Sequence, residues 1–379
     1  MKAFSYKLRP TKPQRATLGA TLETCRRLYN GLLAERKDAW ENEKRAIGFA
    51  AQCASLPARK ASSDYFPAVH SQVLQNVVHR LDRSFANFFR RVKNGETAGS
   101  PRFKGRGRYD SFCYPQWGNG ATFSDGRLAL SKIGSVRVCT DRPLEGTPKT
   151  CTIVRRADGW YAHVVCETKA AALSATGKAV AVDVGISHFA TLSTGETIAN
   201  PRHYRTVERQ LKKAHRRLSR RVKGSQRRAK ARILLAKAHL KVKRQRLDFA
   251  HKTALALVGR FDTIVVEDLN IRGMLKNHAL AKHIQVAGWG LFRQVLTDKA
   301  ANAGRYVVAV NPAGTSQQCS ECGNVVPKRL ACRWHSCPYC GCEMDRDHNA
   351  ASNILTRGGT AFGEPLPLGV ALNREPHRL

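Results

Sequence analysis

Apolar and polar residues alternate at the start of the chain. In MKAFSYKLRP, Phe4, Tyr6 and Leu8 occupy every second position, the spacing that places side chains on one face of a strand. Behind Thr11, whose hydroxyl can cap a helix, apolar residues recur at helical spacing as far as Leu32. The pattern therefore predicts a strand followed by an amphipathic helix.

A second helix is predicted over residues 69–92, after a loop-like stretch at 55–67. Its apolar side chains recur on one face, which we expect to pack in a core. These positions are Val73, Val77, Leu81, Phe85, Phe88 and Phe89.

Between residues 109 and 168 the chain changes to short alternating segments separated by turn signals. Asp125-Gly126 and Asp158-Gly159 are dipeptides typical of two-residue hairpin turns. We predict a small antiparallel β-barrel here, which the strand at 1–10 can join, with the helices as an insertion.

Another pattern begins with KAVAVDV at 178–184, a continuous apolar run followed by two strands around a Thr194-Gly195 hairpin. Residues 262–269 (DTIVVEDL) and 306–310 predict two more strands, with a helix at 288–303 between them. Three strands, a helix, two strands and a helix follow the order of an RNase H-like layer, a sheet covered by helices.

The charge of the chain favours a polyanionic partner. There are 65 Lys+Arg against 28 Asp+Glu, a net charge of +37. Residues 202–246 contain 19 Lys/Arg and one acid, Glu208, inside a helical hairpin predicted at 202–258 and broken at 223–225. Charge of one sign repels itself unless a polyanion offsets it, so we expect DNA or RNA there and at the glycine-rich basic loop 95–108. The predicted backbone contacts are Lys104, Arg106, Lys212 and Arg216.

We expect no membrane partner. The chain has no apolar stretch of 18 or more residues, and its N-terminus lacks the apolar region of a secretion signal. A cytoplasmic, nucleoid-associated location is the corresponding expectation.

Four of the twelve cysteines have metal-ligand spacing. Cys319 and Cys322 form one CxxC pair, and Cys337 and Cys340 form another, as in a zinc ribbon whose two tight turns present four thiolates to one ion. Four protein ligands leave no open position, so the predicted Zn²⁺ is structural. Unliganded thiols are the alternative. Cys332 and Cys342 lie outside the pairs and are interpreted as spare thiols.

Three acids occupy comparable places: Asp183 and Glu267 at strand ends, and Asp347 at the start of a helix. In an RNase H-like sheet the first and fourth strands are neighbours, so Asp183 and Glu267 can face each other. Converging carboxylates need cations between them, and two Mg²⁺ ions about 3.5–4 Å apart would allow phosphodiester hydrolysis. Three alternatives stay open: Asp183 as a turn residue, Asp347 as a helix cap with Asp345 competing for either role, and Asp268 in place of Glu267.

Several segments together resemble one family. They are AVDVGIS, RLDFAHKTA, IVVEDLNI, TSQQCSECG with CPYCG, and DRDHNAASNIL, with KLRPTKPQ and SPRFKGR nearer the start. In this combination and order, over about residues 1–357, the chain resembles the TnpB family of transposon-encoded RNA-guided endonucleases, related to type V CRISPR effectors. By position, the resemblance assigns the three catalytic acids to Asp183, Glu267 and Asp347.

The resemblance implies an α+β multidomain fold: a small wedge β-barrel with a helical insertion, and an RNase H-like (RuvC) nuclease domain with an inserted zinc ribbon. The implied boundaries are 1–11 and 108–170 for the wedge, 12–107 for the helical recognition insertion, 176–316 and 343–358 for the nuclease, and 317–342 for the ribbon. The last helix is predicted to stop at Arg357-Gly358-Gly359, before a disordered tail at 359–379.

The function expected from the resemblance is RNA-guided hydrolysis of target DNA, with staggered double-strand cleavage. Its partners would be a guide RNA from the transposon end and double-stranded DNA carrying a short adjacent motif. Gln72 and Asn76 are the hypothetical readers of that motif, because amide side chains suit adenine. Two alternatives remain: a nuclease-inactive RNA-guided DNA-binding protein, and an RNase H-fold transposase. Whether two chains assemble is left undecided.

Overall fold

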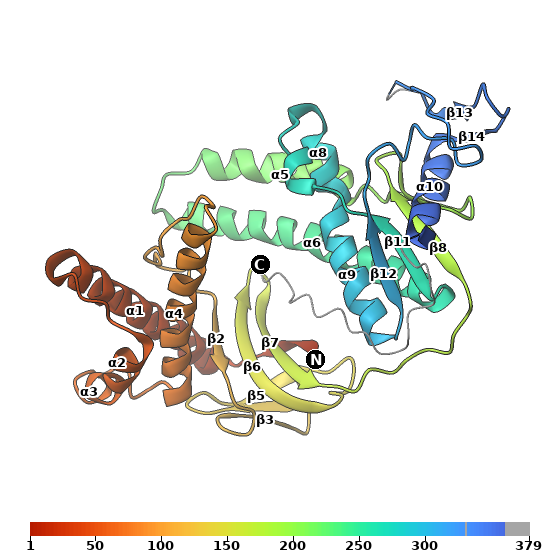
Figure 1. Ribbon diagram of the computed structural model, residues 1–379. Helices are drawn as coiled ribbons and strands as arrows, with labels where there is room; N and C mark the ends of the chain where they lie inside the picture. The colour runs from red at the N-terminus through yellow and green to blue at the C-terminus, as the bar shows by residue number, and fades with distance from the viewer. Residues whose placement is uncertain (330–331, 361–379) are drawn as a thin grey trace. The chain divides into compact units, whose positions relative to one another are not determined.

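The computed structural model describes residues 1–329 and 332–360. The chain divides into two compact units, which meet in sequence between Lys169 and Ala170 (Figure 1). Most of the predicted disordered tail, residues 361–379, lies outside the described residues. No described helix combines the length and the apolar character needed to cross a lipid bilayer.

The N-terminal unit contains a seven-stranded antiparallel sheet. Its strands are β1 (Lys2–Arg9), β2 (Ser111–Tyr114), β3 (Ala121–Ser124), β4 (Arg127–Leu130), β5 (Gly134–Cys139), β6 (Thr147–Arg156) and β7 (Gly159–Glu167). Phe4, Tyr6 and Leu8 are buried and their neighbours in β1 are exposed, so the predicted alternation holds. β1 lies between β7 and β5 in the middle of the sheet.

This sheet is a curled half-barrel, not the closed barrel that the sequence predicts (Figure 1). Its order is β2-β6-β7-β1-β5-β4-β3, and among residues 1–329 and 332–360 no ladder joins β2 to β3. Both predicted hairpins are present, but the second turns at Ala157-Asp158, because Gly159 already pairs with Arg156 in the ladder. Asp125 and Gly126 both have positive φ, 49° and 69°, the left-handed pair that a tight hairpin turn requires.

Four helices accompany the sheet: α1 (Lys12–Glu43), α2 (Phe49–Ala54), α3 (Leu56–Ala61) and α4 (Ser71–Lys93). Thr11 caps α1 through a reciprocal hydrogen-bond pair with Gln14, as its position predicts. The loop expected at 55–67 is partly wrong, because α3 occupies its first half. Pro57 is tolerated there since the first turn of a helix needs no backbone N–H donor.

The apolar face of α4 is shorter than predicted. Val73, Val77 and Leu81 are buried in the core of the N-terminal unit, and Phe85 packs partly against it. Phe89 is 60% exposed, so the predicted face does not reach the end of the helix.

The C-terminal unit is built on a five-stranded sheet of order β10-β9-β8-β11-β12. Its strands are β8 (Ala179–Val184), β9 (His188–Leu192), β10 (Thr197–Ala199), β11 (Thr263–Glu267) and β12 (Tyr306–Val310). β8 runs parallel to β11 and β11 parallel to β12, whereas β9 is antiparallel to both of its neighbours. The predicted adjacency of the first and fourth strands is therefore present.

Helices cover both faces of this sheet. Val182 and Val266 belong to a core that includes residues of α6 (Gln226–Arg260) and α9 (Trp289–Asn302). Ala181 and Val265 point to the other face, where they pack with Ile354 of α10 (Arg346–Thr360). Two short helices absent from the prediction, α7 (Ile271–Met274) and α8 (His278–Ala287), lie between β11 and α9.

The last helix continues past its predicted stop at Arg357-Gly358-Gly359, as far as Thr360. A Cβ at Gly358 would come within 2.5 Å of Val265 Cγ2, too close for any other residue. This glycine therefore allows α10 to approach β11 closely, and that packing holds the helix together where sequence propensity predicts an end.

The basic helical hairpin consists of α5 (His203–Ser219) and α6, and Ser225 caps α6 after the predicted break. A small apolar cluster that includes Leu211 and Leu235 joins the two helices. The ribbon segment between β12 and α10 carries a two-stranded sheet, β13 (Trp334–Ser336) and β14 (Glu343–Asp345).

Candidate active site and cysteine site

Asp183 and Glu267 end two adjacent parallel strands at the same level. The β8–β11 register pairs Val182 with Val266, so each acid follows a paired residue. Side chains alternate along a strand, so both acids share the sheet face of Ala181 and Val265, which is the face that α10 covers.

Asp347 lies in the first turn of α10, beside the end of β8. A Cβ at Gly185 would stand 3.9 Å from Asp347 Oδ2, which places this carboxylate close to the residues that follow Asp183. Asp345, not Asp347, caps the helix: its Oδ1 accepts from the backbone N–H groups of Asp347 and His348 at 2.8 and 3.2 Å. The carboxylate of Asp347 is thus available for another role.

The surroundings of Asp183 and Glu267 disfavour their negative charge. Burial raises the pKa of Asp183 well above its ordinary value, and the nearby carboxylates of Glu267, Asp347 and Asp345 raise it further. Burial also raises the pKa of Glu267, while the Thr315 hydroxyl and the Arg357 charge oppose that rise. A cation among these groups would relieve both the burial cost and the repulsion.

Asp268 points to the opposite face. Its carboxylate pairs with Arg293 Nη1 of α9 at 2.6 Å, on the side of the sheet away from α10. The alternation that separates Glu267 from Asp268 therefore leaves Glu267 beside Asp183.

Two arginines contact Asp347. Arg346 donates through Nε and Nη2 to Asp347 Oδ1 at 3.1 and 3.0 Å, and Arg333 Nη1 lies 3.4 Å from Oδ2. The carboxylate group is therefore held between two positive charges from the ribbon and from its own helix.

Sequence reasoning missed the residues that hold this site together. The Thr315 hydroxyl, on a residue only 2% exposed, donates to Glu267 Oε1 at 2.8 Å. Asn349 and Asn353, one helical turn apart on α10, donate to the carbonyl of Gln318, both at 2.7 Å. Arg357, a further turn along, donates to the carbonyls of Asn311 and Ala313. The signal in the sequence is this spacing of four residues on one helix face.

The four paired cysteines lie together. Cys319 Sγ is 3.7 Å from Cys340 Sγ, and Cys322 Sγ is 3.5 Å from Cys337 Sγ. Four thiolates about 2.3 Å from a tetrahedral Zn²⁺ stand about 3.8 Å apart, so the donor set fits zinc. Gly323 and Gly341 have φ of 76° and 74°, and each donates its N–H to the carbonyl of the first cysteine of its pair.

The two other cysteines of the ribbon differ. Cys332 is exposed, and its Sγ contacts the carbonyl oxygen of Trp334 at 3.3 Å. Cys342, interpreted from the sequence as a spare thiol outside the pairs, lies beside the cluster. Its Sγ, the Cys319 Sγ and a ring nitrogen of His335 lie within 4.8 Å of one another.

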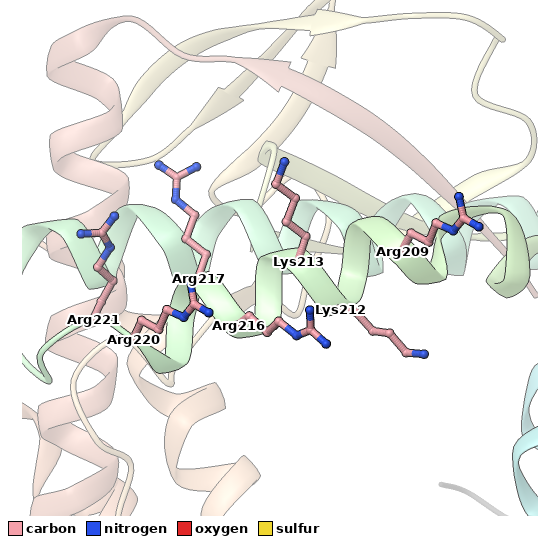
Figure 2. Close-up of a pocket in the computed structure, with 7 residues that line it drawn as sticks. All are labelled: Arg209, Lys212, Lys213, Arg216, Arg217, Arg220 and Arg221. Atoms are coloured by element: carbon pink, nitrogen blue, oxygen red, sulfur yellow. The ribbon is translucent and has the colours of Figure 1, made fainter.

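The outward face of α5 carries a dense row of cations, and Figure 2 shows their side chains fanning outward from the helix. They are Arg209, Lys212, Lys213, Arg216, Arg217, Arg220 and Arg221. Within the described part of the chain, only Lys212 among these seven reaches a carboxylate, that of Glu208 at 3.2 Å. The row can therefore approach a polyanion.

Two of the four predicted contacts in the N-terminal unit, Gln72 and Lys104, have local partners. The Gln72 amide donates to the Gln116 side chain, and Lys104 Nζ lies 5.5 Å from the centre of the Tyr29 ring. Asn76 is half-buried on α4. Arg106 is exposed and lines a hollow of about 250 Å³ together with two other arginines, Arg26 and Arg155. These four residues stay predicted contacts.

Comparison with known proteins places the chain in a family. A protein of Streptomyces pristinaespiralis named "Putative RNA-guided DNA endonuclease" is 37% identical over 388 residues, covering 100% of this chain and 94% of that protein. The chain belongs to the TnpB family. An Escherichia coli K12 relative, "Putative RNA-guided DNA endonuclease InsQ", is 30% identical and covers 99% of this chain and 97% of its own length.

Three family models match parts of this TnpB-family chain. Residues 163–278 match the OrfB_IS605 family, described as "Probable transposase", and 289–354 match "Cas12f1-like, TNB domain". Residues 1–45 match a model described as "Helix-turn-helix domain", although here they form one strand and one long helix.

The fold is similar to that of a solved structure. It is named "Cryo-EM structure of the Cas12f1-sgRNA-target DNA complex", with a TM-score of 0.56 at 14% identity over 89% of this chain and 81% of that one.

Proposed function

We propose that this TnpB-family protein is an RNA-guided DNA endonuclease that hydrolyses phosphodiester bonds at Asp183, Glu267 and Asp347. The observation that supports the proposal is the placement of Asp183 and Glu267 on the sheet face that α10 covers, with Asp347 in the first turn of α10; burial and neighbouring carboxylates raise the pKa of Asp183. The names of relatives that match nearly the whole chain support the same activity.

The C-terminal unit supports an RNase H-like (RuvC) nuclease fold. Its strand order β10-β9-β8-β11-β12, with one antiparallel meander followed by parallel strands, is the order expected of that layer, and α6, α9 and α10 cover its faces. We assign the curled sheet of the N-terminal unit to the wedge, and α1–α4 to the recognition insertion.

The carboxylates fit divalent cations. Mg²⁺ prefers hard oxygen ligands such as carboxylates. The raised pKa values of Asp183 and Glu267 indicate that this site favours added positive charge. When bound, Mg²⁺ supplies an activated water and stabilises the leaving oxygen. The protein's part is positional: β8 and β11 hold two carboxylates level, Thr315 fixes the orientation of Glu267, and the cap by Asp345 sets the start of α10.

The four-cysteine ribbon would hold a structural Zn²⁺. Its segment is tied to α10 by the hydrogen bonds from Asn349 and Asn353 to Gln318, the residue just before Cys319. The ion would therefore stabilise the segment that also carries Thr315, without taking part in the chemistry.

The nucleic-acid partners are a guide RNA and a double-stranded DNA target with a short adjacent motif. The row of cations on α5 suits a phosphate backbone, because charge contacts of this kind supply affinity without reading sequence. Gln72 and Asn76 remain the candidates for reading the motif.

The test begins with the RNA that copurifies with the full-length protein. Its sequence would identify the guide, and a plasmid library with a matching target and randomised flanks would then be incubated with the complex and Mg²⁺. We expect guided cuts that need a particular flank and that disappear with Asp183→Asn. Cleavage that ignores the RNA, or that persists in Asp183→Asn, would refute the proposal.

A second candidate is an RNase H-fold transposase, which the "Probable transposase" model over residues 163–278 favours. The same reaction distinguishes the two, because a transposase would join a cut transposon end to target DNA, whereas the endonuclease leaves free ends. A nuclease-inactive binding protein would retain guided binding and produce no cuts.

A further inference from the structure

Two side chains outside the four-cysteine set lie beside it. His335 and Cys342 approach Cys319 so closely that the three donor atoms are all within 4.8 Å of one another. Cys319 also belongs to the four-cysteine set, so two candidate donor sets share one thiolate. An ion bound to Cys319 therefore needs to move only a short distance to pass from one donor set to the other.

One ring nitrogen of the His335 imidazole has no hydrogen-bond partner among the described residues. The side chain is fully buried; this nitrogen is Nε2, while Nδ1 contacts Lys328 Nζ. A buried polar atom without a partner loses its hydration without compensation and is uncommon in folded proteins. Coordination of a metal is one role that satisfies such a nitrogen, and mixed thiolate–imidazole sets are ordinary zinc sites.

The two sets differ in depth. In the four-cysteine set Cys322 and Cys340 are exposed and Cys319 and Cys337 are buried, whereas the second set has no exposed member: Cys319 and His335 are buried and Cys342 is partly buried. Backbone pairing holds the inner donors without an exposed thiolate: His335 pairs with Met344, the Cys342 carbonyl accepts from the Cys337 N–H, and the Cys319 N–H donates to Asn324. The ribbon therefore offers its ion a second binding position, which lies deeper in the protein than the four-cysteine position.

We propose that His335 and Cys342 are reserve ligands of the ribbon's metal ion. When Cys340 is lost, the ion is held by Cys319, His335 and Cys342, and the protein keeps its zinc. The inference rests on the zinc site of the proposed function and adds to it a coordination mode that uses residues outside both CxxC pairs.

The experiment measures zinc affinity of the full-length protein by competition with a chromophoric chelator. Cys340→Ser alone is expected to keep one zinc per chain. Adding His335→Gln or Cys342→Ser to it should weaken binding by at least about tenfold, the loss typical of removing a group that supports a metal site. Adding Cys332→Ser, the matched cysteine that lies away from the cluster, should change nothing.

Substitution with Co²⁺ gives a second readout. Cys340→Ser should keep the strong visible bands of a tetrahedral site, with the pattern of mixed sulfur and nitrogen ligands. Adding His335→Gln should remove the nitrogen component. His335→Gln and Cys342→Ser in the native background should bind zinc as the unmodified protein does, which shows that the ribbon still folds without them.

Equal affinities for Cys340→Ser with and without the added substitutions would overturn the proposal, since three cysteines and a water would then hold the ion. Complete loss of zinc from Cys340→Ser, with zinc retained in the two single controls, would overturn it too. An unmodified protein without zinc would contradict both this inference and the zinc part of the proposed function. None of these outcomes depends on DNA cleavage, so failure of the nuclease proposal stays distinguishable.

Discussion

The carboxylate site and the cysteine site lie in the same unit, yet their donors are held in opposite ways. The acids come from two strands and a helix. Burial raises the pKa values of Asp183 and Glu267, and neighbouring carboxylates raise that of Asp183 further. The thiols come from two tight turns, where the backbone N–H of Asn324 lowers the pKa of Cys322 to about 6. Each turn brings its two thiols together over four consecutive residues, whereas the sheet and α10 bring together acids that lie far apart in the chain.

This difference suits their proposed roles. Thiols positioned by local turns form a closed site that supports folding. Carboxylates that repel one another must be held by a rigid sheet, and they favour cations that can also engage a phosphate. α10 links the two sites, because Asp347 lies in its first turn while Asn349 and Asn353 bond the segment before Cys319.

The largest expected effect is a difference between substitutions of two neighbouring acids, Glu267 and Asp268. Glu267→Gln should lower the guided cleavage rate by about a thousandfold or more, because it removes a charged ligand of the proposed metal site, worth several kcal/mol. Asp268→Asn, the matched control on the opposite face, should stay within about threefold because it disturbs only an exposed pair with Arg293. Single-turnover cleavage measures both, and equal losses would show that the sheet face does not decide which acid is catalytic.

The next effect tests the link through α10. Cys319→Ser should reduce zinc content and lower cleavage by about 10- to 100-fold, the range seen when support of a site is lost. Hydrogen exchange should speed up across residues 315–345 and stay unchanged in residues 1–169, because the ribbon unfolds locally. Full cleavage by a zinc-free ribbon would mean that the two sites are independent.

A smaller effect concerns the hydroxyl that holds Glu267. Thr315→Val removes a hydrogen bond that lowers the pKa of Glu267, so that pKa should rise and the acid limb of the cleavage profile should move to higher pH. We expect a loss of about tenfold near neutral pH. Thr297→Val, on the exposed side of α9, should leave the profile in place; a uniform loss without a pH shift would indicate damage to packing alone.

The smallest effect is a dependence of stability on pH. The folded, metal-free protein holds the Asp183 proton more tightly than the unfolded chain, whose pKa is near 3.8. That contribution to stability is present below pH 3.8 and is lost as pH rises through the raised pKa of the folded protein. Each tenfold difference in proton affinity between the folded and unfolded chains corresponds to about 1.4 kcal/mol. Stabilisation by Mg²⁺ should increase over the same window, since binding requires the carboxylate form.

Unfolding midpoints measured with and without Mg²⁺ across that window check this linkage. Asp183→Asn should reduce the pH dependence of the unfolding midpoint, both with and without Mg²⁺. If the dependence on Mg²⁺ and pH survives in Asp183→Asn, other carboxylates bind the ion.

Much of the candidate site could be predicted from sequence because its signals are local. The apolar runs that end in Asp183 and Glu267 gave two strands, alternation separated Glu267 from Asp268, and the CxxC spacing selected four of the six ribbon cysteines. These features depend on the periodicity of a strand or the geometry of a turn, which a few consecutive residues determine.

Only the tertiary structure decided the rest, because the deciding contacts join residues far apart in the chain. Helix propensity predicts an end near Gly358, but close packing on Val265 continues α10 to Thr360. Alternating strands suggest a barrel, yet whether β2 and β3 meet depends on the curl of the whole sheet. Thr315 beside Glu267, and His335 and Cys342 beside Cys319, have no spacing that announces them, since folding alone brings their atoms within reach.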